Sequence, residues 1–237
     1  MVDHRTVDVA GIRLACRVSG PPQGPPLVLL HSMGEHAGTW AEVAPALARR
    51  SRVYAFDLRG HGRSDWPGTY SLELMKDDVL ASLDALGLGR VDLIGHSMGG
   101  IVSYLLAQER PDQVGRLVLE EAPLPLPREP FPATRPEGEL DFDWDLVGAV
   151  RSQIDTPDPR WLDGLGLITA RTLVVAGGPD SHVPQAGLAE LARRVPDGRL
   201  VTFPVGHLVH EAAPDEFVRA VEEFLAEDSE GPSTTAR

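Results

Sequence analysis

The stretch Val91-Asp92-Leu93-Ile94-Gly95-His96-Ser97-Met98-Gly99-Gly100 decides how this chain folds. Residues 91–94 form a short apolar run typical of a buried strand, and residues 101–107 follow the pattern of a helix. Between them, Gly-His-Ser-Met-Gly matches the G-x-S-x-G nucleophile elbow, a sharp turn that exposes a serine hydroxyl. The residues two before and two after Ser97 must lack Cβ, because strand and helix nearly touch there. The stretch therefore predicts Ser97 as a nucleophile, with a helix N-terminus aimed at any negative charge that forms beside it.

A serine nucleophile needs a base and an orienting acid, and the chain supplies both in the order expected for this turn. Asp180 follows a predicted buried strand at 172–176, and His207 follows another at 199–204. Loops after parallel strands meet at the carboxyl edge of the sheet, which is also the edge of Ser97. The sequence therefore predicts that these three side chains lie close together.

Five segments of the chain together resemble the α/β-hydrolase fold enzymes, over roughly residues 7–225. These segments are His31-Ser32-Met33-Gly34 with Trp40, Asp57-Leu58-Arg59-Gly60-His61-Gly62-Arg63-Ser64, Gly95–Gly100, Gly177-Gly178-Pro179-Asp180 with Val183-Pro184, and Gly206-His207 with Glu211-Ala212-Ala213-Pro214. Within that family the chain looks most like the small esterases, enol-lactonases and cofactor-free haloperoxidase-type hydrolases. The resemblance implies an α/β fold with a mostly parallel, doubly wound sheet and a small lid insertion.

The resemblance also implies a catalytic triad of Ser97, Asp180 and His207. A second source for the acid stays open, because some members of this fold use the end of the earlier strand, where this chain has Glu120 and Glu121. We favour Asp180, because its Gly-Gly-Pro-Asp loop fits the usual acid loop of the family.

The oxyanion hole is expected from the backbone N–H groups of Met33 and Met98. One departure concerns this hole: Ser32 stands where the family usually has a glycine that eases a tight turn. Serine there either shifts the loop or adds a hydroxyl near the oxyanion. The polar turn of Asp57, Arg59 and His61 is expected to hold the loop after a strand in place.

The chain is expected to form one domain over residues 1–226, with a lid insertion at about 123–168 and a polar, disordered tail at 227–237. The first part of the insertion is too rich in proline for a regular helix, and helices are predicted at 145–154 and 159–165. Its aromatic side chains either line an acyl or aryl pocket or seal the lid onto the body. They are Phe131, Phe142, Trp144 and Trp161.

Composition excludes several classes of partner. The formal net charge of −13 argues against nucleic acid and against anionic membranes. Cys16 is the single cysteine, so no internal disulfide can form, and the sequence shows no export signal or membrane span. His207-Leu208-Val209-His210-Glu211 does not follow the H-E-x-x-H order of metalloproteases, so no metal is expected. We expect a cytoplasmic monomer or homodimer without a cofactor, acting on a small molecule.

The expected activity is hydrolysis of an ester or lactone of a small neutral molecule through an acyl-enzyme. A non-hydrolytic enzyme of the same fold, such as a perhydrolase, lyase or cyclase, is one alternative. A second is an enzyme like the monoacylglycerol lipases, suggested by Gly34-Glu35-His36. The third is a non-enzymatic ligand receptor, which the presence of all three triad positions disfavours.

Overall fold

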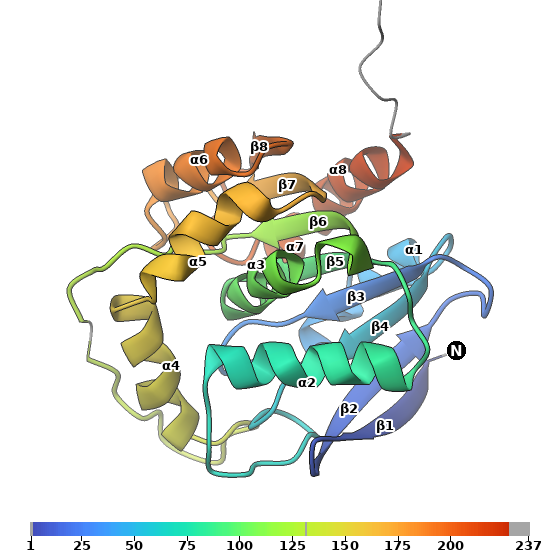
Figure 1. Cartoon of the computed structure of the whole chain (residues 1–237), viewed down its shortest axis with the longest axis horizontal. Helices are drawn as coiled ribbons and strands as arrows, with labels where there is room; N and C mark the ends of the chain where they lie inside the picture. Colours follow the sequence, from blue (N-terminus) through green and yellow to red (C-terminus); the bar gives the residue numbers. More distant parts are fainter. Residues whose placement is uncertain (1, 131, 228–237) are drawn as a thin grey trace, which may run out of the picture.

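The computed structural model describes residues 2–130 and 132–227, which fold around an eight-stranded sheet (Figure 1). The strand order is β1-β2-β4-β3-β5-β6-β7-β8. The strands are β1 (Asp3–Val9), β2 (Ile12–Ser19), β3 (Pro26–Leu30), β4 (Arg52–Phe56), β5 (Val91–His96), β6 (Val114–Glu120), β7 (Arg171–Ala176) and β8 (Gly198–Thr202). β1 and β2 pair antiparallel with each other, β2 pairs antiparallel with β4, and the other neighbours are parallel. The predicted mostly parallel, doubly wound sheet is confirmed.

Helices cover both faces of this sheet and divide the core into two clusters. One face carries α2 (Leu72–Ala85), α3 (Met98–Glu109) and α6 (Gln185–Arg194). The other carries the 3₁₀ helix η1 (Ala37–Ala41), α1 (Ala44–Leu47), α7 (Val209–Ala212) and α8 (Pro214–Ala226), and a short η2 (Pro111–Gln113) precedes β6. The central strands are buried from both sides, as their unbroken apolar runs indicate.

Local signals account for where several helices begin and end. The Ser71 side chain accepts the Leu74 N–H at 3.0 Å and caps the start of α2. The segment at 40–50 reads as one helix from its pattern, but it forms a 3₁₀ turn followed by a single short helix. Pro45 explains the break, because it cannot donate the backbone hydrogen bond that a continuous helix needs there.

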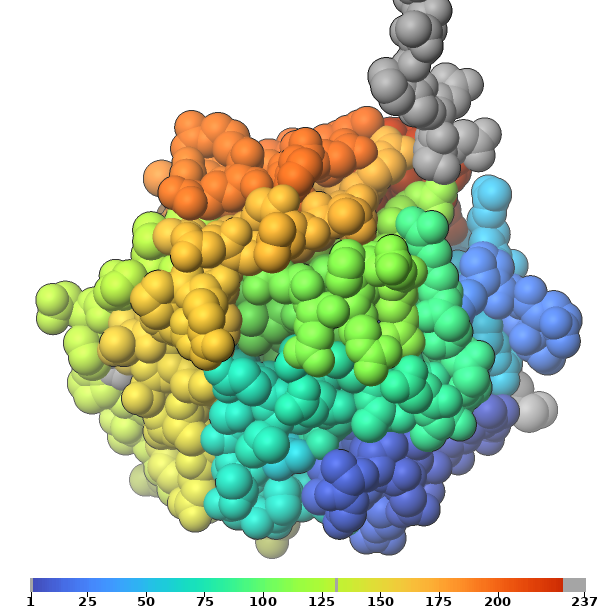
Figure 2. Space-filling view, viewed as in Figure 1, coloured from blue at the N-terminus to red at the C-terminus, as the bar shows by residue number. Residues whose placement is uncertain are grey.

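The insertion after β6 contains α4 (Asp145–Asp155), α5 (Pro159–Asp163) and η3 (Gly164–Leu167). α4 meets the start of α2 (Figure 2), where Gln153 accepts the Leu72 N–H at 2.7 Å and donates to Glu73 at 2.5 Å. Within the described residues, no helix combines the length and apolar character needed to cross a bilayer.

The polar tail was expected to begin at Glu227, and residues 228–237 lie outside the described part of the chain. Glu227 itself is held in place. Its carboxylate accepts from Arg171 and from Arg199, the latter at 2.7 Å, and its carbonyl accepts from Arg116 at 2.9 Å. Three arginines, one on each of β6, β7 and β8, therefore hold this residue against the sheet.

Candidate active site

Ser97 lies between β5 and α3 in a backbone conformation that few residues with a side chain adopt, with φ 50° and ψ −111°. Its N–H donates to the Glu120 carbonyl at 2.8 Å, so the sheet ladder holds the turn in place. The flanking glycines are needed for space. A Cβ on Gly95 would lie 2.4 Å from the Gly99 carbonyl oxygen, and one on Gly99 would lie 2.3 Å from that of Leu30. The predicted elbow is therefore present, with the serine half-buried at its apex.

His207 lies on the loop after β8, with 16% of its side chain exposed. Its ring centroid is 4.7 Å from that of His96, the residue before Ser97. Among the described residues, no hydrogen bond joins the Ser97 hydroxyl to the His207 ring, so it is the ring of His96 that brings His207 close to the elbow. Such bonds are often long before substrate binds and tighten in the complex. The structure thus brings the predicted nucleophile and base to the same place.

The carboxylate that faces His207 is not the one we favoured as the acid. Asp180 is exposed and makes no hydrogen bond or ion pair with His207 among the described residues. The Nδ1 atom of His207 instead lies 3.2 Å from Oε2 of Glu121, whose side chain is fully buried. The geometry therefore favours the alternative source of the acid, at the end of β6.

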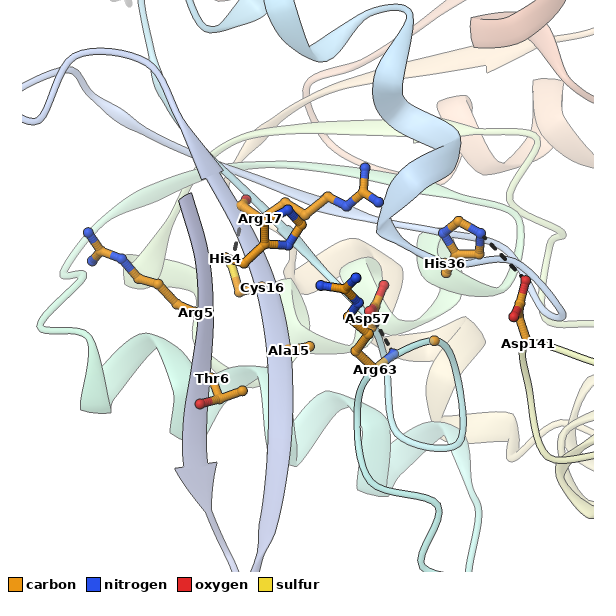
Figure 3. A pocket seen from close by; sticks show the side chains of 11 residues that line it. His4, Arg5, Thr6, Ala15, Cys16, Arg17, His36, Asp57, Arg63 and Asp141 are labelled. Atoms are coloured by element: carbon orange, nitrogen blue, oxygen red, sulfur yellow. Dashed lines mark hydrogen bonds and ion pairs between the residues drawn. The ribbon is translucent and has the colours of Figure 1, made fainter. Parts of the chain in front are cut away.

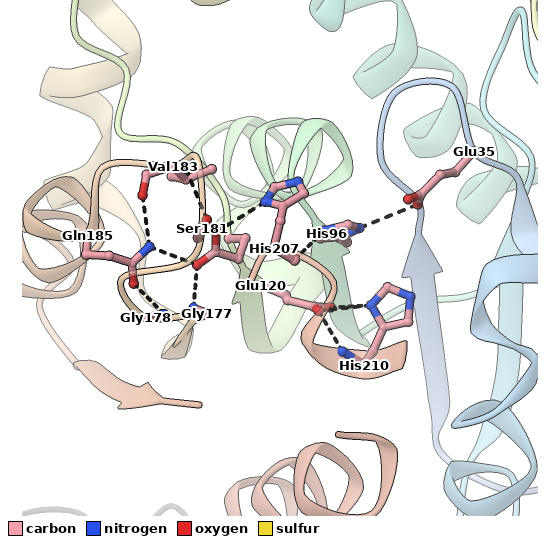
Figure 4. Close-up of polar contacts among 11 residues, drawn as sticks. Glu35, His96, Glu120, Gly177, Gly178, Ser181, Val183, Gln185, His207 and His210 are labelled. Atoms are coloured by element: carbon pink, nitrogen blue, oxygen red, sulfur yellow. Dashed lines mark hydrogen bonds and ion pairs between the residues drawn. The ribbon is translucent and has the colours of Figure 1, made fainter. Parts of the chain in front are cut away.

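Residues of the loop expected to supply the acid, and Gln185 after it, hydrogen-bond the Glu121 carboxylate instead; these residues are labelled beside His207 in Figure 4. Gly177 donates its N–H to Oε1 at 2.5 Å, Gln185 donates to the same oxygen at 3.2 Å, and the Ser181 hydroxyl donates to Oε2. Burial raises the pKa of Glu121, but the hydrogen bonds from His207, Ser181 and Gly177 outweigh it, and the pKa lies below the usual value. The carboxylate is therefore ionised where it faces the imidazole.

Glu121 has a positive φ of 49°, close to the 50° of Ser97. Its N–H donates to the Val175 carbonyl at 2.9 Å, as that of Ser97 does to Glu120. Among the described residues other than glycine, Ala10 in the β1–β2 turn is the one further case of positive φ. Two strained residues thus end two adjacent strands, and strain of this kind concentrates at functional sites. No sequence signal indicates a positive φ at a glutamate.

The neighbouring Glu120 holds a second histidine. Its carboxylate lies 2.8 Å from Nδ1 of His210 and accepts the His210 N–H at 2.9 Å, and both side chains are fully buried. The His210 ring stacks on Trp40 with centroids 4.3 Å apart. Glu120 therefore fixes the short helix α7, which directly follows the loop of His207.

The two expected oxyanion donors are free to bind a ligand. Within the described chain the N–H groups of Met33 and Met98 have no hydrogen-bond acceptor, and Met98 is the first residue of α3. Ser32 is accommodated without strain, because the positive φ of this loop falls on Gly34. The Ser32 N–H donates to Oε2 of Glu35 at 3.2 Å and closes the turn.

The polar turn after β4 supports this oxyanion loop, as predicted. His61 accepts the Gly34 N–H at 3.1 Å through Nε2, and Asp57 accepts the N–H groups of Ala37 at 2.6 Å and Arg63 at 2.9 Å. The Asp57 carboxylate lies in the wall of a cavity of about 310 Å³ that none of the expected reacting residues line (Figure 3). We therefore assign this turn to positioning the loop.

The aromatic side chains of the insertion have different surroundings. Phe142 lies against the oxyanion loop, since a Cβ on Gly34 would be 3.3 Å from its ring. Trp144 lines a cavity of about 400 Å³ between α4 and the proline-rich segment. Trp161 is 6% exposed and packs in the core, which agrees with the sealing role. Phe131 lies outside the described residues.

Comparison with known proteins identifies the family. A family model for the alpha/beta hydrolase fold matches residues 25–163, which is more than half of the chain. The chain belongs to the α/β-hydrolase fold family.

Individual relatives are hydrolases of several kinds. The chain is 30% identical to the 2-hydroxymuconate semialdehyde hydrolase of a Pseudomonas species, over 94% of each chain. It is 27% identical to the fluoroacetate dehalogenase of a Burkholderia species, over 99% of this chain and 97% of the relative. Among solved structures, the N-acyl homoserine lactone degrading enzyme Est816 superposes with a TM-score of 0.80 at 27% identity, over 93% of this chain and 100% of that one.

Proposed function

We propose that this α/β-hydrolase is a serine hydrolase that cleaves an ester or lactone of a small neutral molecule through an acyl-enzyme. Ser97 is the nucleophile, His207 the base, and Glu121 the acid that orients it. One observation carries the proposal: a serine in a strained backbone conformation directly follows His96, whose ring lies 4.7 Å from that of His207, and Nδ1 of His207 faces a buried carboxylate 3.2 Å away. This arrangement is the one that nucleophilic acyl transfer requires.

The reaction follows from these positions. Ser97 Oγ attacks the carbonyl carbon while its proton moves to Nε2 of His207, and Nδ1–H donates to Glu121, which stabilises the imidazolium. The N–H groups of Met33 and Met98 bind the oxyanion, each donor being worth about 3 kcal/mol in the transition state. The imidazolium protonates the leaving oxygen, which departs. His207 then takes a proton from water, whose oxygen attacks the acyl carbon and releases the acid and Ser97.

The insertion supports a small, neutral substrate. Its segment from Glu137 to Asp145 carries five acidic residues, of which Glu137, Glu139, Asp141 and Asp145 are exposed. Their negative field disfavours an anionic substrate at low ionic strength. The similarity to a lactone-degrading enzyme supports lactones as well as esters.

A substrate series tests the specificity. We expect kcat/KM to be higher for acetate and aryl esters and for lactones than for palmitate esters or carboxylate-bearing esters. A steady rise towards the long chains would instead favour the lipase-like alternative suggested by the Gly34-Glu35-His36 segment.

Covalent labelling tests the nucleophile. A fluorophosphonate should add its mass to a single peptide, the one that contains residues 91–110, and Ser97→Ala should abolish both labelling and turnover. Ser152→Ala, on the exposed side of α4, is the matched control and should label normally. Labelling that persists in Ser97→Ala would overturn the proposal. Burst release of a chromogenic alcohol, followed by slower steady turnover in water, separates a hydrolase from a lyase or cyclase.

A further inference from the structure

His96, the residue before Ser97, is fully buried and touches all three loops of the proposed site (Figure 4). It belongs to the elbow itself. Its Nε2–H donates to the His207 carbonyl at 3.1 Å, on the base loop. Its Nδ1 lies 3.5 Å from Oε2 of Glu35, on the oxyanion loop. One imidazole therefore links the segments that carry the nucleophile, the base and one oxyanion donor.

The Glu35 end of this link reaches the oxyanion donor directly. The oxygen that faces His96 also accepts the N–H of Ser32, the residue before Met33. Burial raises the pKa of Glu35, but His96 and the Ser32 N–H lower it to about 2. Burial also opposes the charge on His96, but Glu120 and Glu35 raise its pKa above the usual value. Both shifts favour an ion pair at this contact, in which His96 is fully buried and 21% of the Glu35 side chain is exposed.

A packing role alone does not account for this arrangement. Packing requires only a side chain of the right volume, whereas both ring nitrogens of His96 face polar atoms. An apolar residue would leave the His207 carbonyl without the donor that His96 supplies and would remove the imidazole beside Glu35. A buried polar group that loses its partner destabilises the fold.

We propose that Glu35 and His96 are a positioning pair, which holds the Met33 N–H and the His207 loop in register with Ser97. The inference rests on the proposed function and adds two residues to it. Neither residue touches the substrate. Their effect is on the geometry of the oxyanion hole, which matters more in the transition state than in the ground state.

The test compares Glu35→Gln, which keeps the shape and removes the charge, with Glu42→Gln. Glu42 is exposed directly after η1, and its side chain makes no hydrogen bond or ion pair among the described residues. For Glu35→Gln we expect kcat on a short aryl ester to fall about 10- to 100-fold while KM changes by less than about threefold. The affinity for a boronic acid, which mimics the tetrahedral intermediate, should fall by a similar factor as kcat. Glu42→Gln should match the unmodified protein.

A double-mutant cycle completes the test. If the two residues act as a unit, Glu35→Gln with His96→Gln should lose no more kcat than the more damaging single variant. Losses that multiply, or a Glu35→Gln variant with kcat within about twofold of the unmodified protein, would overturn the inference. Should His96→Gln fail to fold, the kcat and boronate results for Glu35→Gln decide alone.

The outcome also separates this inference from the proposed function. If the unmodified protein does not label at Ser97, the proposed function fails. If it labels and turns over normally but Glu35→Gln does the same, only the positioning pair fails.

Discussion

Two consecutive glutamates at the end of β6 hold two histidines that lie three residues apart, and the two pairs differ in their access to solvent. Glu120 and His210 are both sealed in the core, and Nε2 of His210 is buried without a hydrogen-bond partner among the described residues. His207 faces the equally buried Glu121 but remains partly exposed. The same two side-chain types thus anchor a backbone segment in one case and, in the proposed mechanism, prepare a base in the other. Access to the second ring nitrogen makes the difference.

The strongest test of this comparison is a change of acid. Glu121→Gln should lower kcat/KM by about 10⁴-fold, because an amide no longer favours the reactive imidazole tautomer or stabilises the imidazolium. Asp180→Asn is the matched control and should stay near the unmodified protein, since its side chain is exposed. Steady-state kinetics on one chromogenic ester measures both. The reverse result would restore Asp180, the residue that the loop pattern favoured.

The Glu120–His210 pair, which we call the inner pair, should show its effect in the stability of the fold and not in catalysis. Glu120→Gln leaves the fully buried His210 without its carboxylate partner and removes a negative charge that also acts on His96. Removing one partner of a buried pair costs about 3 kcal/mol or more. Urea unfolding measures this loss, and Glu121→Gln is the comparison, with a smaller loss expected. If Glu120→Gln unfolds at the same urea concentration as the unmodified protein, the inner pair is not an anchor.

The sequence predicted those parts of the site that depend on local pattern. Ser97 and its glycines are specified within five residues, and His207 follows the last predicted strand. The acid depends on details that no local pattern contains. Glu121 reaches the imidazole because its backbone takes a positive φ and because Gly177 and Ser181 point at its carboxylate rather than leaving room for Asp180. These are consequences of how distant loops pack.

The insertion shows the same limit. Its two helices follow from periodicity, but the pattern did not distinguish Trp161, which packs in the core, from Phe142, which lies on the oxyanion loop. Both are aromatic residues in an acidic, proline-rich segment. Which face each side chain presents depends on contacts with α3 and with residues near position 34, far away in the sequence.

A second contrast among the histidines predicts a dependence of stability on pH. His31 and His61 are buried and have no hydrogen bond or ion pair with a carboxylate in the described part of the chain. Each accepts a backbone N–H through Nε2, from Leu58 at 3.0 Å and from Gly34 at 3.1 Å. A proton on that nitrogen would face another N–H. Burial is the main cause that lowers the pKa of His31 to about 4 and that of His61 to about 3.

The sign follows from proton uptake. Both histidines take up protons near pH 6.5 in the unfolded chain but not in the folded one, so stability should fall as the pH drops below 6.5. Glu35 and Glu121, whose pKa values are lowered in the fold, add to this loss of stability only below about pH 4.5, their ordinary pKa. The raised pKa of His96 changes stability only above pH 6.5, where stability falls as the pH rises. The melting temperature should therefore decrease as the pH is lowered from 6.5 to 4.5, and this decrease should be less steep in His61→Gln. A flat profile over this range would contradict the neutral assignment.

The smallest effect is expected at His182, a third histidine beside the site. Its ring centroid is 4.2 Å from that of His207, but it is exposed and has no carboxylate partner among the described residues. If a buried carboxylate is what turns a histidine into a working base here, His182→Gln should change kcat/KM by no more than about threefold, as for other surface substitutions. The same ester assay measures it, with Glu121→Gln as the reference for a large loss. A loss of 10-fold or more in kcat would mean that ring contact with His207, and not the glutamate alone, holds the base in place.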